Sequence, residues 1–176
     1  MSVSAYYYLA DWDTFVARYA EAGNADEYYK KYYDSEQPWL QAFEPTMWHK
    51  SHSWSPQTTA FLFHEEIAEH LKPDLRKRLE SFLQSFGLIQ GEVVNDLGKD
   101  TGYFAIAISP NSVRELLKTS LLLDFEDFRS YYENYYNDDN ERWLETFDAL
   151  KEYLQGFVDI LAEANRNSMG VVIWIA

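Results

Sequence analysis

Two segments of the chain repeat the same arrangement of paired tyrosines. They are Tyr28-Tyr29-Lys30-Lys31-Tyr32-Tyr33, the first tyrosine segment, and Tyr131-Tyr132-Glu133-Asn134-Tyr135-Tyr136, the second tyrosine segment. On a helix, positions i, i+1, i+4 and i+5 form one stripe, so each segment would place its phenols side by side. A phenol combines a large apolar body with a polar tip, which makes tyrosine a frequent residue at protein interfaces. The pattern therefore favours recognition of another protein.

Acidic residues flank both tyrosine segments. Carboxylates beside aromatic rings suit a basic partner, because an arginine can stack on a ring and pair with the neighbouring acid. We therefore predict a partner surface made of Tyr28, Tyr29, Tyr32, Tyr33, Asp34, Glu36, Tyr131, Tyr132, Tyr135, Tyr136, Asp138 and Asp139. The alternative is that half of each stripe belongs to the core and half to a hydrated rim. An exposed stripe could equally build a homodimer.

The overall charge agrees with a basic partner. The sequence has 15 Lys and Arg against 29 Asp and Glu, a formal net charge of -14. Such a field repels phosphate backbones and anionic headgroups, so we expect no direct binding to nucleic acids or membranes. It would steer basic proteins towards the chain if the acids cluster on one face. The alternative is that the acidity only keeps an aromatic-rich protein soluble.

The histidines indicate a second hypothesis, a small-molecule enzyme or ligand-binding domain with its pocket in region 36–64. The candidate pocket residues are His49, His52, His64 and Glu65. The spacing of His49 and His52 could hold a metal only on a helix, and Ser51, Ser53 and Pro56 predict a loop there. Ala68 stands four positions after His64, so the zinc-protease pattern of two histidines on one helical face is missing. We therefore expect neither a metal nor a cofactor.

No catalytic constellation stands out in the sequence. The chain has no cysteine, which excludes thiol nucleophiles and disulfides. It contains no nucleophile elbow, phosphate loop or dinucleotide fingerprint. Asp96 and Asp100 could act as paired carboxylates, but a segment rich in Asp, Asn and Gly is more typical of a turn. The sequence thus favours a non-enzymatic binding protein over an enzyme.

The N-terminal ten residues have no basic residue and carry three consecutive tyrosines, unlike a secretory signal peptide. The longest apolar run, 171–176, is too short to span a bilayer. From these features we expect a cytoplasmic protein.

Strands and helices alternate along the chain. Apolar runs predict strands near 3–10, 103–108 and 171–175, with apolar residues at successive positions as in strands buried on both faces. Asp11 and Ser109-Pro110 offer helix starts, and further helices are expected from Thr58 and from Pro73 to Gly87. Region 36–57 is rich in proline and tryptophan, so we predict a packed loop without regular structure. The expected architecture is α+β, a small central sheet covered by helices, in a single domain of residues 1–176.

The last predicted helix is the longest. Its apolar positions recur at spacings of four and three, at Trp143, Phe147, Leu150, Leu154, Phe157 and Leu161. Such a stripe predicts an amphipathic helix packed on the protein's own sheet, although a coiled-coil partner is an alternative. Gly156 within the helix lowers its intrinsic stability.

The C-terminal half resembles a known family. The residues that carry the likeness are Ser109-Pro110 with Val113 and Leu116, Phe125 to Arg129, Trp143, Leu150 to Tyr153, and Gly170 to Ile175. In the spacing of these residues the chain resembles the YfbM-like family of bacterial proteins of unknown function. The resemblance implies a small bacterial cytosolic α+β protein and carries over no activity, cofactor or catalytic residue.

Overall fold

The centre of the molecule is a four-stranded antiparallel sheet. The computed structural model describes residues 5–32, 35–49, 56–89, 95–97, 105–137 and 146–175. The strands are β1 (Ala5–Ala10), β2 (Leu40–Ala42), β3 (Ala105–Ile108) and β4 (Gly170–Ile175), in the order β2-β1-β4-β3. β1 and β4 pair along their whole length, from Ala5 opposite Ile175 to Ala10 opposite Gly170. The predicted α+β fold and its three strands are confirmed.

Each central strand divides its side chains between two cores. In β4, Val171 and Ile173 belong to a large core on one face of the sheet, and Val172 belongs to a small core on the other. In β1, Tyr7 and Leu9 face the large core in the same way. Since successive side chains of a strand point to opposite faces, a sheet covered on both sides needs apolar residues at successive positions. This is why these strands lack the polar alternation of a half-exposed sheet.

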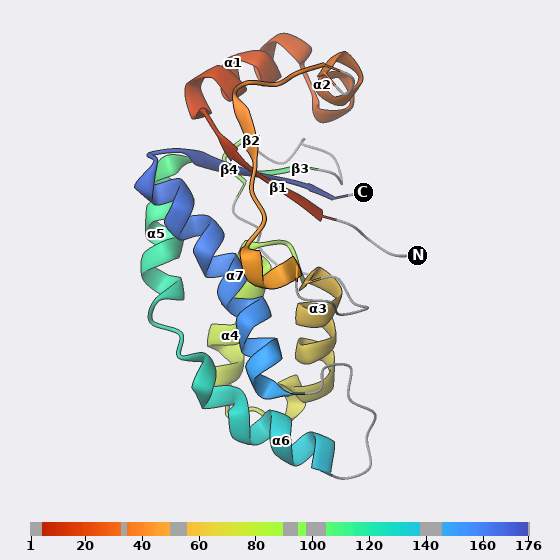
Figure 1. The fold of residues 1–176 in the computed structure, drawn as a ribbon, viewed down its shortest axis with the longest axis vertical. Coiled ribbons are helices and arrows are strands. Elements are labelled where there is room, and N and C mark those ends of the chain that lie inside the picture. Colours follow the sequence, from red (N-terminus) through yellow and green to blue (C-terminus); the bar gives the residue numbers. More distant parts are fainter. Residues whose placement is uncertain are drawn as a thin grey trace.

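Two helices, α1 (Trp12–Ala22) and α2 (Ala25–Tyr32), cover one face of the sheet (Figure 1). Asp11 caps α1 as predicted, because its carboxylate accepts a hydrogen bond from the Thr14 amide. Gly23 ends α1 at φ 90°, a conformation that glycine adopts without strain, and its amide donates to the Tyr19 carbonyl. The small core beneath these helices contains Ala10, Phe15, Tyr19, Ala25, Tyr28, Tyr32, Ala107 and Val172.

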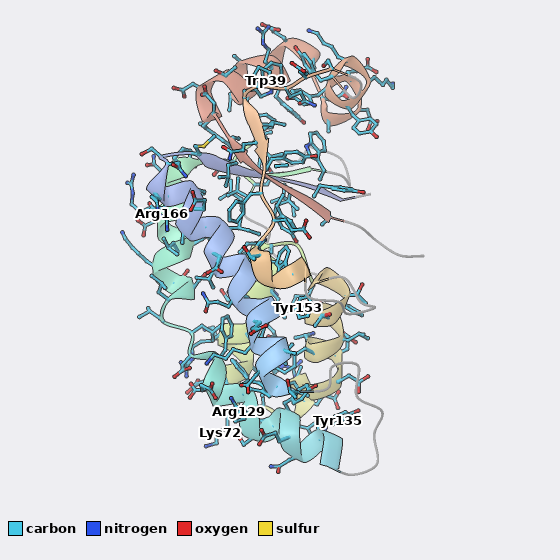
Figure 2. The ribbon with its side chains drawn as sticks, viewed as in Figure 1. Trp39, Lys72, Arg129, Tyr135, Tyr153 and Arg166 are labelled. Atoms are coloured by element: carbon cyan, nitrogen blue, oxygen red, sulfur yellow. The ribbon has the colours of Figure 1, made fainter. Side chains whose placement is uncertain are left out.

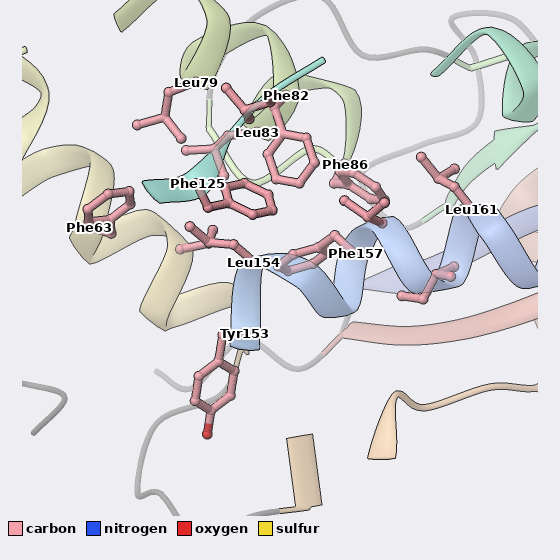
Figure 3. Close-up of a cluster of buried hydrophobic side chains, with 14 of the residues drawn as sticks. Phe63, Leu79, Phe82, Leu83, Phe86, Phe125, Tyr153, Leu154, Phe157 and Leu161 are labelled. Atoms are coloured by element: carbon pink, nitrogen blue, oxygen red, sulfur yellow. The ribbon is translucent and has the colours of Figure 1, made fainter. Parts of the chain in front are cut away.

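The other face is covered by the long helix α7 (Phe147–Arg166) and the helices around it (Figure 1). These are α3 (Pro56–Ile67), α4 (Pro73–Ser85), α5 (Pro110–Ser120) and α6 (Arg129–Asn137), with the 3-10 helices η2 (Ala68–His70) and η4 (Phe125–Phe128). The stripe residues Phe147, Leu150, Leu154, Phe157 and Leu161 are all buried in the large core, and Figure 3 shows Leu154, Phe157 and Leu161 beside Phe82 and Phe86. The stripe is buried as predicted, but the helix packs against α3 and α5 as well as against the sheet; Trp143 lies outside the described residues.

Region 36–57 contains regular structure, so that part of the prediction was wrong. β2 pairs with the edge of β1, where the Phe43 amide donates to the Tyr7 carbonyl (2.9 Å) and the Asp11 amide to the Trp39 carbonyl (2.8 Å). A 3-10 helix, η1 (Thr46–His49), follows. β2 pairs with backbone groups at the edge of β1 that would otherwise lack hydrogen bonds. This pairing is a tertiary contact, so the three residues of β2 carry no sequence pattern that would predict a strand. The predicted packing of Trp48 is confirmed, since it is buried.

Residues 95–97 close the outer edge of β3. The Asp96 amide donates to the Ala107 carbonyl (2.8 Å), and the Asn95 side chain accepts from the Ala107 amide (3.4 Å). The Asp96 carboxylate accepts from the Ser109 amide (2.5 Å). Burial raises the pKa of Asp96, but the hydrogen bonds from Ser109 and Ser112 outweigh it and leave the pKa below its ordinary value. Asp96 therefore connects residues 95–97 to the end of β3 and the start of α5. Asp100 lies outside the described residues.

No helix within the described ranges has both the length and the apolar character needed to cross a membrane.

The glycine in α7 is explained by Trp48. The Trp48 indole lies directly over Gly156, and its Nε1 donates to the Tyr153 carbonyl (3.1 Å). A Cβ at position 156 would fall far inside van der Waals contact with this ring. The ring also packs edge-on against Tyr7 and Phe157, which restricts its movement away from Gly156. The absence of a side chain at Gly156 thus allows Trp48 of η1 to pack against α7.

We expect Gly156→Ala to lower the free energy of unfolding by about 1–3 kcal/mol, the usual cost of overpacking a core. The sign is informative, because alanine in an unhindered helix position stabilises by about 1 kcal/mol relative to glycine. Urea unfolding followed by circular dichroism measures the change. In a Trp48→Phe background the same substitution should cost clearly less. An equal cost in both backgrounds would show that contact with the indole is not the cause.

Candidate functional site

The first tyrosine segment lies on α2 and is divided between core and surface. Tyr28 and Tyr32 are buried in the small core, whereas Tyr29 is 50% exposed. Glu36 is exposed after the helix, and Tyr33 and Asp34 lie outside the described residues. The described part of this segment therefore agrees with the alternative of half core and half rim.

The hydroxyl of Tyr28 takes part in a short chain of hydrogen bonds. Trp39 Nε1 donates a hydrogen bond to this oxygen (2.7 Å), and the Tyr28 hydroxyl donates to Gln37 Oε1 (2.9 Å). Burial raises the pKa of Tyr28 to about 12, although the bond from Trp39 acts in the opposite direction. Trp174 stacks on the Tyr28 ring at 5.8 Å between centroids. Tyr28 thus stays protonated in neutral solution and connects α2 to the sheet.

The second tyrosine segment lies on α6 and is also divided. Tyr132 is buried against Phe63 and Phe147, and Tyr131 and Tyr135 are half-buried at the border of the large core. The Tyr135 hydroxyl donates to the Glu66 carboxylate, which raises the pKa of the phenol. Asp138, Asp139 and the side chain of Tyr136 lie outside the described residues.

The two tyrosine segments lie at opposite ends of the longest axis of the molecule (Figure 1). Figure 2 shows the same separation between Trp39, beside α2, and Tyr135 on α6. The large core and the sheet stand between them. The structure therefore does not bring the two predicted parts of the partner surface together, and each end has to be considered separately.

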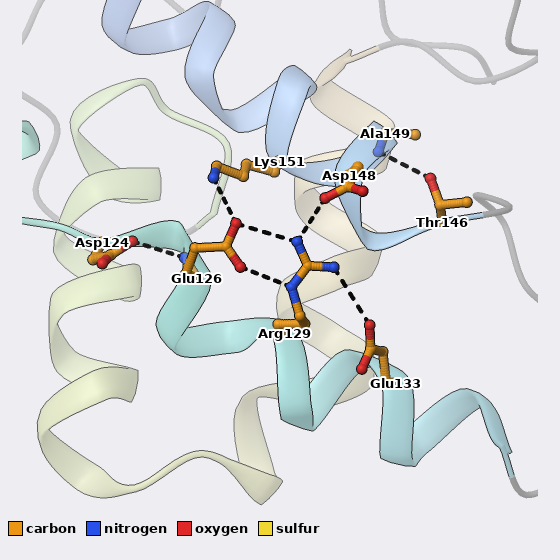
Figure 4. A network of polar contacts seen from close by, with 8 residues as sticks. All are labelled: Asp124, Glu126, Arg129, Glu133, Thr146, Asp148, Ala149 and Lys151. Atoms are coloured by element: carbon orange, nitrogen blue, oxygen red, sulfur yellow. Dashed lines mark hydrogen bonds and ion pairs between the residues drawn. The ribbon is translucent and has the colours of Figure 1, made fainter.

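A network of ion pairs joins η4, α6 and the start of α7 around Arg129 (Figure 4). Arg129 Nε and Nη2 donate to the two oxygens of Glu126 (2.7 and 3.2 Å), Nη2 also to Asp148 (2.6 Å), and Nη1 to Glu133 (3.4 Å). Lys151 Nζ donates to the same Glu126 carboxylate (2.6 Å). Bonds from Arg129 and then Lys151 lower the pKa of Glu126 to about 2.

The guanidinium of Arg129 also lies over the Phe147 ring, 4.7 Å from its centroid. A flat cation held between an aromatic ring and carboxylates loses most of its freedom. Asp124 precedes the network and caps η4, with its carboxylate accepting from the Glu126 amide (2.9 Å). We call the acids of this region the acidic end; they are Asp124, Glu126, Asp127, Glu133 and Asp148, all exposed.

His64 of the alternative pocket takes part in contacts between helices. Its Nε2 lies 3.4 Å from Glu80 Oε1 of α4, and Glu80 in turn accepts a bond from Arg76 (2.7 Å). Glu65 Oε1 lies 3.5 Å from His64 Nδ1, which is buried and has no hydrogen bond of good geometry. The bond from Arg76, followed by that from His64, lowers the pKa of Glu80 below its ordinary value. The arrangement is typical of a structural link between α3 and α4.

Of the four candidates for the alternative pocket, the structure describes the side chains of His64 and Glu65. His52 and the side chain of His49 lie outside the described residues. Within the described ranges, no three side chains of His, Asp or Glu lie close enough to hold a metal ion.

Two aromatic residues that the sequence analysis did not select, Tyr6 and Trp174, lie near Tyr29 of the predicted partner surface. Tyr6 of β1 is 54% exposed and lies opposite Trp174 of β4 in the strand register. The ring of Tyr29 is 6.3 Å from that of Trp174. Three elements distant in sequence thus place aromatic rings near one edge of the small core. Only the strand register could have revealed this grouping.

The comparisons with known proteins give no relative. No protein-family model matches the chain, and neither a curated protein nor a solved structure matches it. The resemblance to the YfbM-like family therefore stays a prediction.

The lowered pKa of Glu126 gives a testable pH dependence. A carboxyl with a pKa of about 2 in the folded protein, against an ordinary 4.5, stabilises the fold above pH 4.5, and this stability is lost as the pH falls through about 2. We expect Glu126→Gln to be less stable than the wild type at pH 7, and the difference to shrink between pH 4.5 and 2. Urea unfolding across this range measures it.

The control is Glu36→Gln, which removes an exposed acid outside the network. It should alter stability little at any pH, since an isolated surface charge contributes little. A difference between wild type and Glu126→Gln that stays constant down to pH 2 would contradict the assignment.

Proposed function

We propose that this protein is a non-enzymatic binding protein, of an inhibitor or immunity type, that contacts a basic protein through its acidic end. One observation carries the proposal. Both cations among the described residues of 121–152, Arg129 and Lys151, are already bound by carboxylates of the same chain. Exposed carboxylates therefore outnumber cations among the described residues of this stretch. A surface with one predominant sign of charge increases the rate at which an oppositely charged protein associates.

The exposures of the charged groups favour this end over the α1–α2 end. The side chains of Arg129 and Lys151 are 35% and 39% exposed, whereas that of their neighbour Asp148 is 72% exposed. At the other end, the side chain of Lys30 is 69% exposed and that of its partner Glu27 is 55% exposed. In these ion pairs, an approaching basic protein would meet the lysine more readily than its acid at the α1–α2 end, and the carboxylate of Asp148 more readily than Arg129 at the acidic end.

The carboxylates of the acidic end can accept further hydrogen bonds. Each ionised carboxylate has about four lone-pair positions, and Glu133 and Asp148 each use one in the network. Asp127 has no ion pair with any described residue, and Asp124 uses its carboxylate to cap η4. Because Arg129 fixes η4, α6 and α7 relative to one another, a partner would find these acceptors already in place, which reduces the entropy lost on binding.

The alternative, a small-molecule enzyme or ligand-binding domain around His64 and Glu65, has weaker support. Its one favourable observation is the buried Nδ1 of His64. The other ring nitrogen is directed at Glu80 within the fold, which is the contact expected of a structural histidine.

A matched pair of triple variants tests the proposal with cytochrome c as the basic probe. We expect Asp124→Asn, Asp127→Asn and Asp148→Asn together to raise the Kd for cytochrome c about tenfold at low salt. Three rim charges at about 0.5 kcal/mol each correspond to this factor. Asparagine keeps the cap at position 124 and can still accept from Arg129 at position 148. Quenching of tryptophan fluorescence by the haem measures binding.

The control variant carries Asp11→Asn, Asp13→Asn and Asp26→Asn at the α1–α2 end. It changes the net charge equally and also retains one helix cap, so its Kd should rise less than about twofold if the acidic end is the contact surface. Equal weakening by the two triple variants would mean that only net charge matters. That result, or no binding at any ionic strength, would overturn the proposal.

A further inference from the structure

Two exposed leucines adjoin the acidic end. Leu121 and Leu122, which we call the leucine turn, follow the last residue of α5 and are 68% and 77% exposed. The other large hydrophobic residues exposed in the described part of the chain, Tyr6, Tyr29 and Phe61, are less exposed. From this turn we infer a docking surface for a basic segment that also carries apolar side chains. The inference rests on the proposed function and specifies the partner's chemistry.

The backbone of the leucine turn is held by hydrogen bonds. The Leu121 amide donates to the Leu117 carbonyl (3.0 Å), and the Leu122 amide to that of Thr119 (3.2 Å). The next residue, Leu123, is buried in the large core, and its amide donates to the Ser120 carbonyl (3.1 Å). The two side chains are thus displayed from a fixed turn, so a partner that covers them would order little additional chain.

The charges beside the leucine turn indicate what covers it. Asp124 lies two residues after Leu122, so their Cα atoms are within about 8 Å of each other. Asp127 is one turn further along η4, and neither acid has an ion pair with a described residue. The nearest cation towards α5, Lys118, is bound to Glu115 (2.7 Å). Apolar side chains followed by carboxylates that pair with no described cation complement a segment in which leucine or phenylalanine alternates with lysine or arginine.

A second copy of this chain fits the leucine turn less well. Two copies that met at Leu121 and Leu122 would bring their Asp124 and Asp127 carboxylates towards one another. Like charges placed across an interface are destabilising, and each copy carries a net charge of -14. A basic segment removes this repulsion and buries the same apolar surface.

Two synthetic peptides separate the apolar contribution from the charge contribution. One is an amphipathic peptide of leucine and lysine, and the other has serine in place of each leucine, with the same number of lysines. We expect Leu121→Ser with Leu122→Ser to raise the Kd of the leucine–lysine peptide at least about tenfold, because two apolar side chains lose their contact. The Kd of the serine–lysine peptide should not change. Fluorescence anisotropy of labelled peptides measures both.

The control is Phe61→Ser, an equivalent change at an exposed apolar residue of α3, which should leave both Kd values unaltered. Thermal unfolding of the double leucine variant should match that of the wild type, since these side chains contribute little to the core. Addition of salt should abolish binding of the serine–lysine peptide but only reduce binding of the leucine–lysine peptide.

The outcomes distinguish this inference from the proposed function. If the leucine variant binds the leucine–lysine peptide as the wild type does, while the acidic-end triple variant binds it weakly, the inference is overturned and the proposed function stands. If neither variant alters binding, both are overturned. If sedimentation shows a wild-type dimer that the leucine variant dissociates, a second copy occupies the surface and the inference is again overturned.

Discussion

The pairing of β4 between β1 and β3 is the interaction on which the rest of the structure depends. It brings residues 5–10, 105–108 and 170–175 together and gives the sheet two faces, both of which must be covered. β4 follows α7 after a short turn, in which Ser168 has φ 55° and the Met169 amide donates to the Ala164 carbonyl (2.9 Å). The register of β4 therefore also fixes where α7 lies on the sheet.

The acidic end is positioned at a distance from the sheet by α7. The C-terminal part of this helix covers the sheet, and Phe157 packs against Tyr7 as well as against Phe82 of α4 and Phe86, the residue that follows α4. Towards its N-terminus the helix extends beyond the strands, where η4 and α6 pack against it (Figure 1). Phe125, Phe128 and Tyr132 of these short elements are buried in the large core together with Phe147 of α7. Arg129 adds to this packing, because its guanidinium contacts acids on all three elements and covers Phe147.

The sequence predicted the elements whose signals are local. The Asp11 and Ser109 caps, the stripe of α7 and the apolar strands β1, β3 and β4 depend on neighbouring residues, and the structure confirms them. β2 depends instead on the unpaired edge of β1, and the spacing of the tyrosines could not decide which ring of each pair is buried. The Arg129 network was not predictable in this way, because Glu126, Asp148 and Lys151 meet only once α6 has packed on α7.

Burial of the tyrosines shifts the proposed recognition from phenols to carboxylates. Two short helices, α1 and α2, cover one face of the sheet. Large rings such as those of Tyr28 and Tyr32 fill the small core between these helices and the sheet. A phenol suits such a boundary because its hydroxyl can reach a polar partner at the rim, as Tyr28 reaches Gln37 and Tyr135 reaches Glu66. Hydroxyls used in this way have no proton left to donate to another protein. The exposed carboxylates near α6 include Asp124 and Asp127, which is why the proposed contact is charge-driven and begins at these acids rather than at the tyrosines.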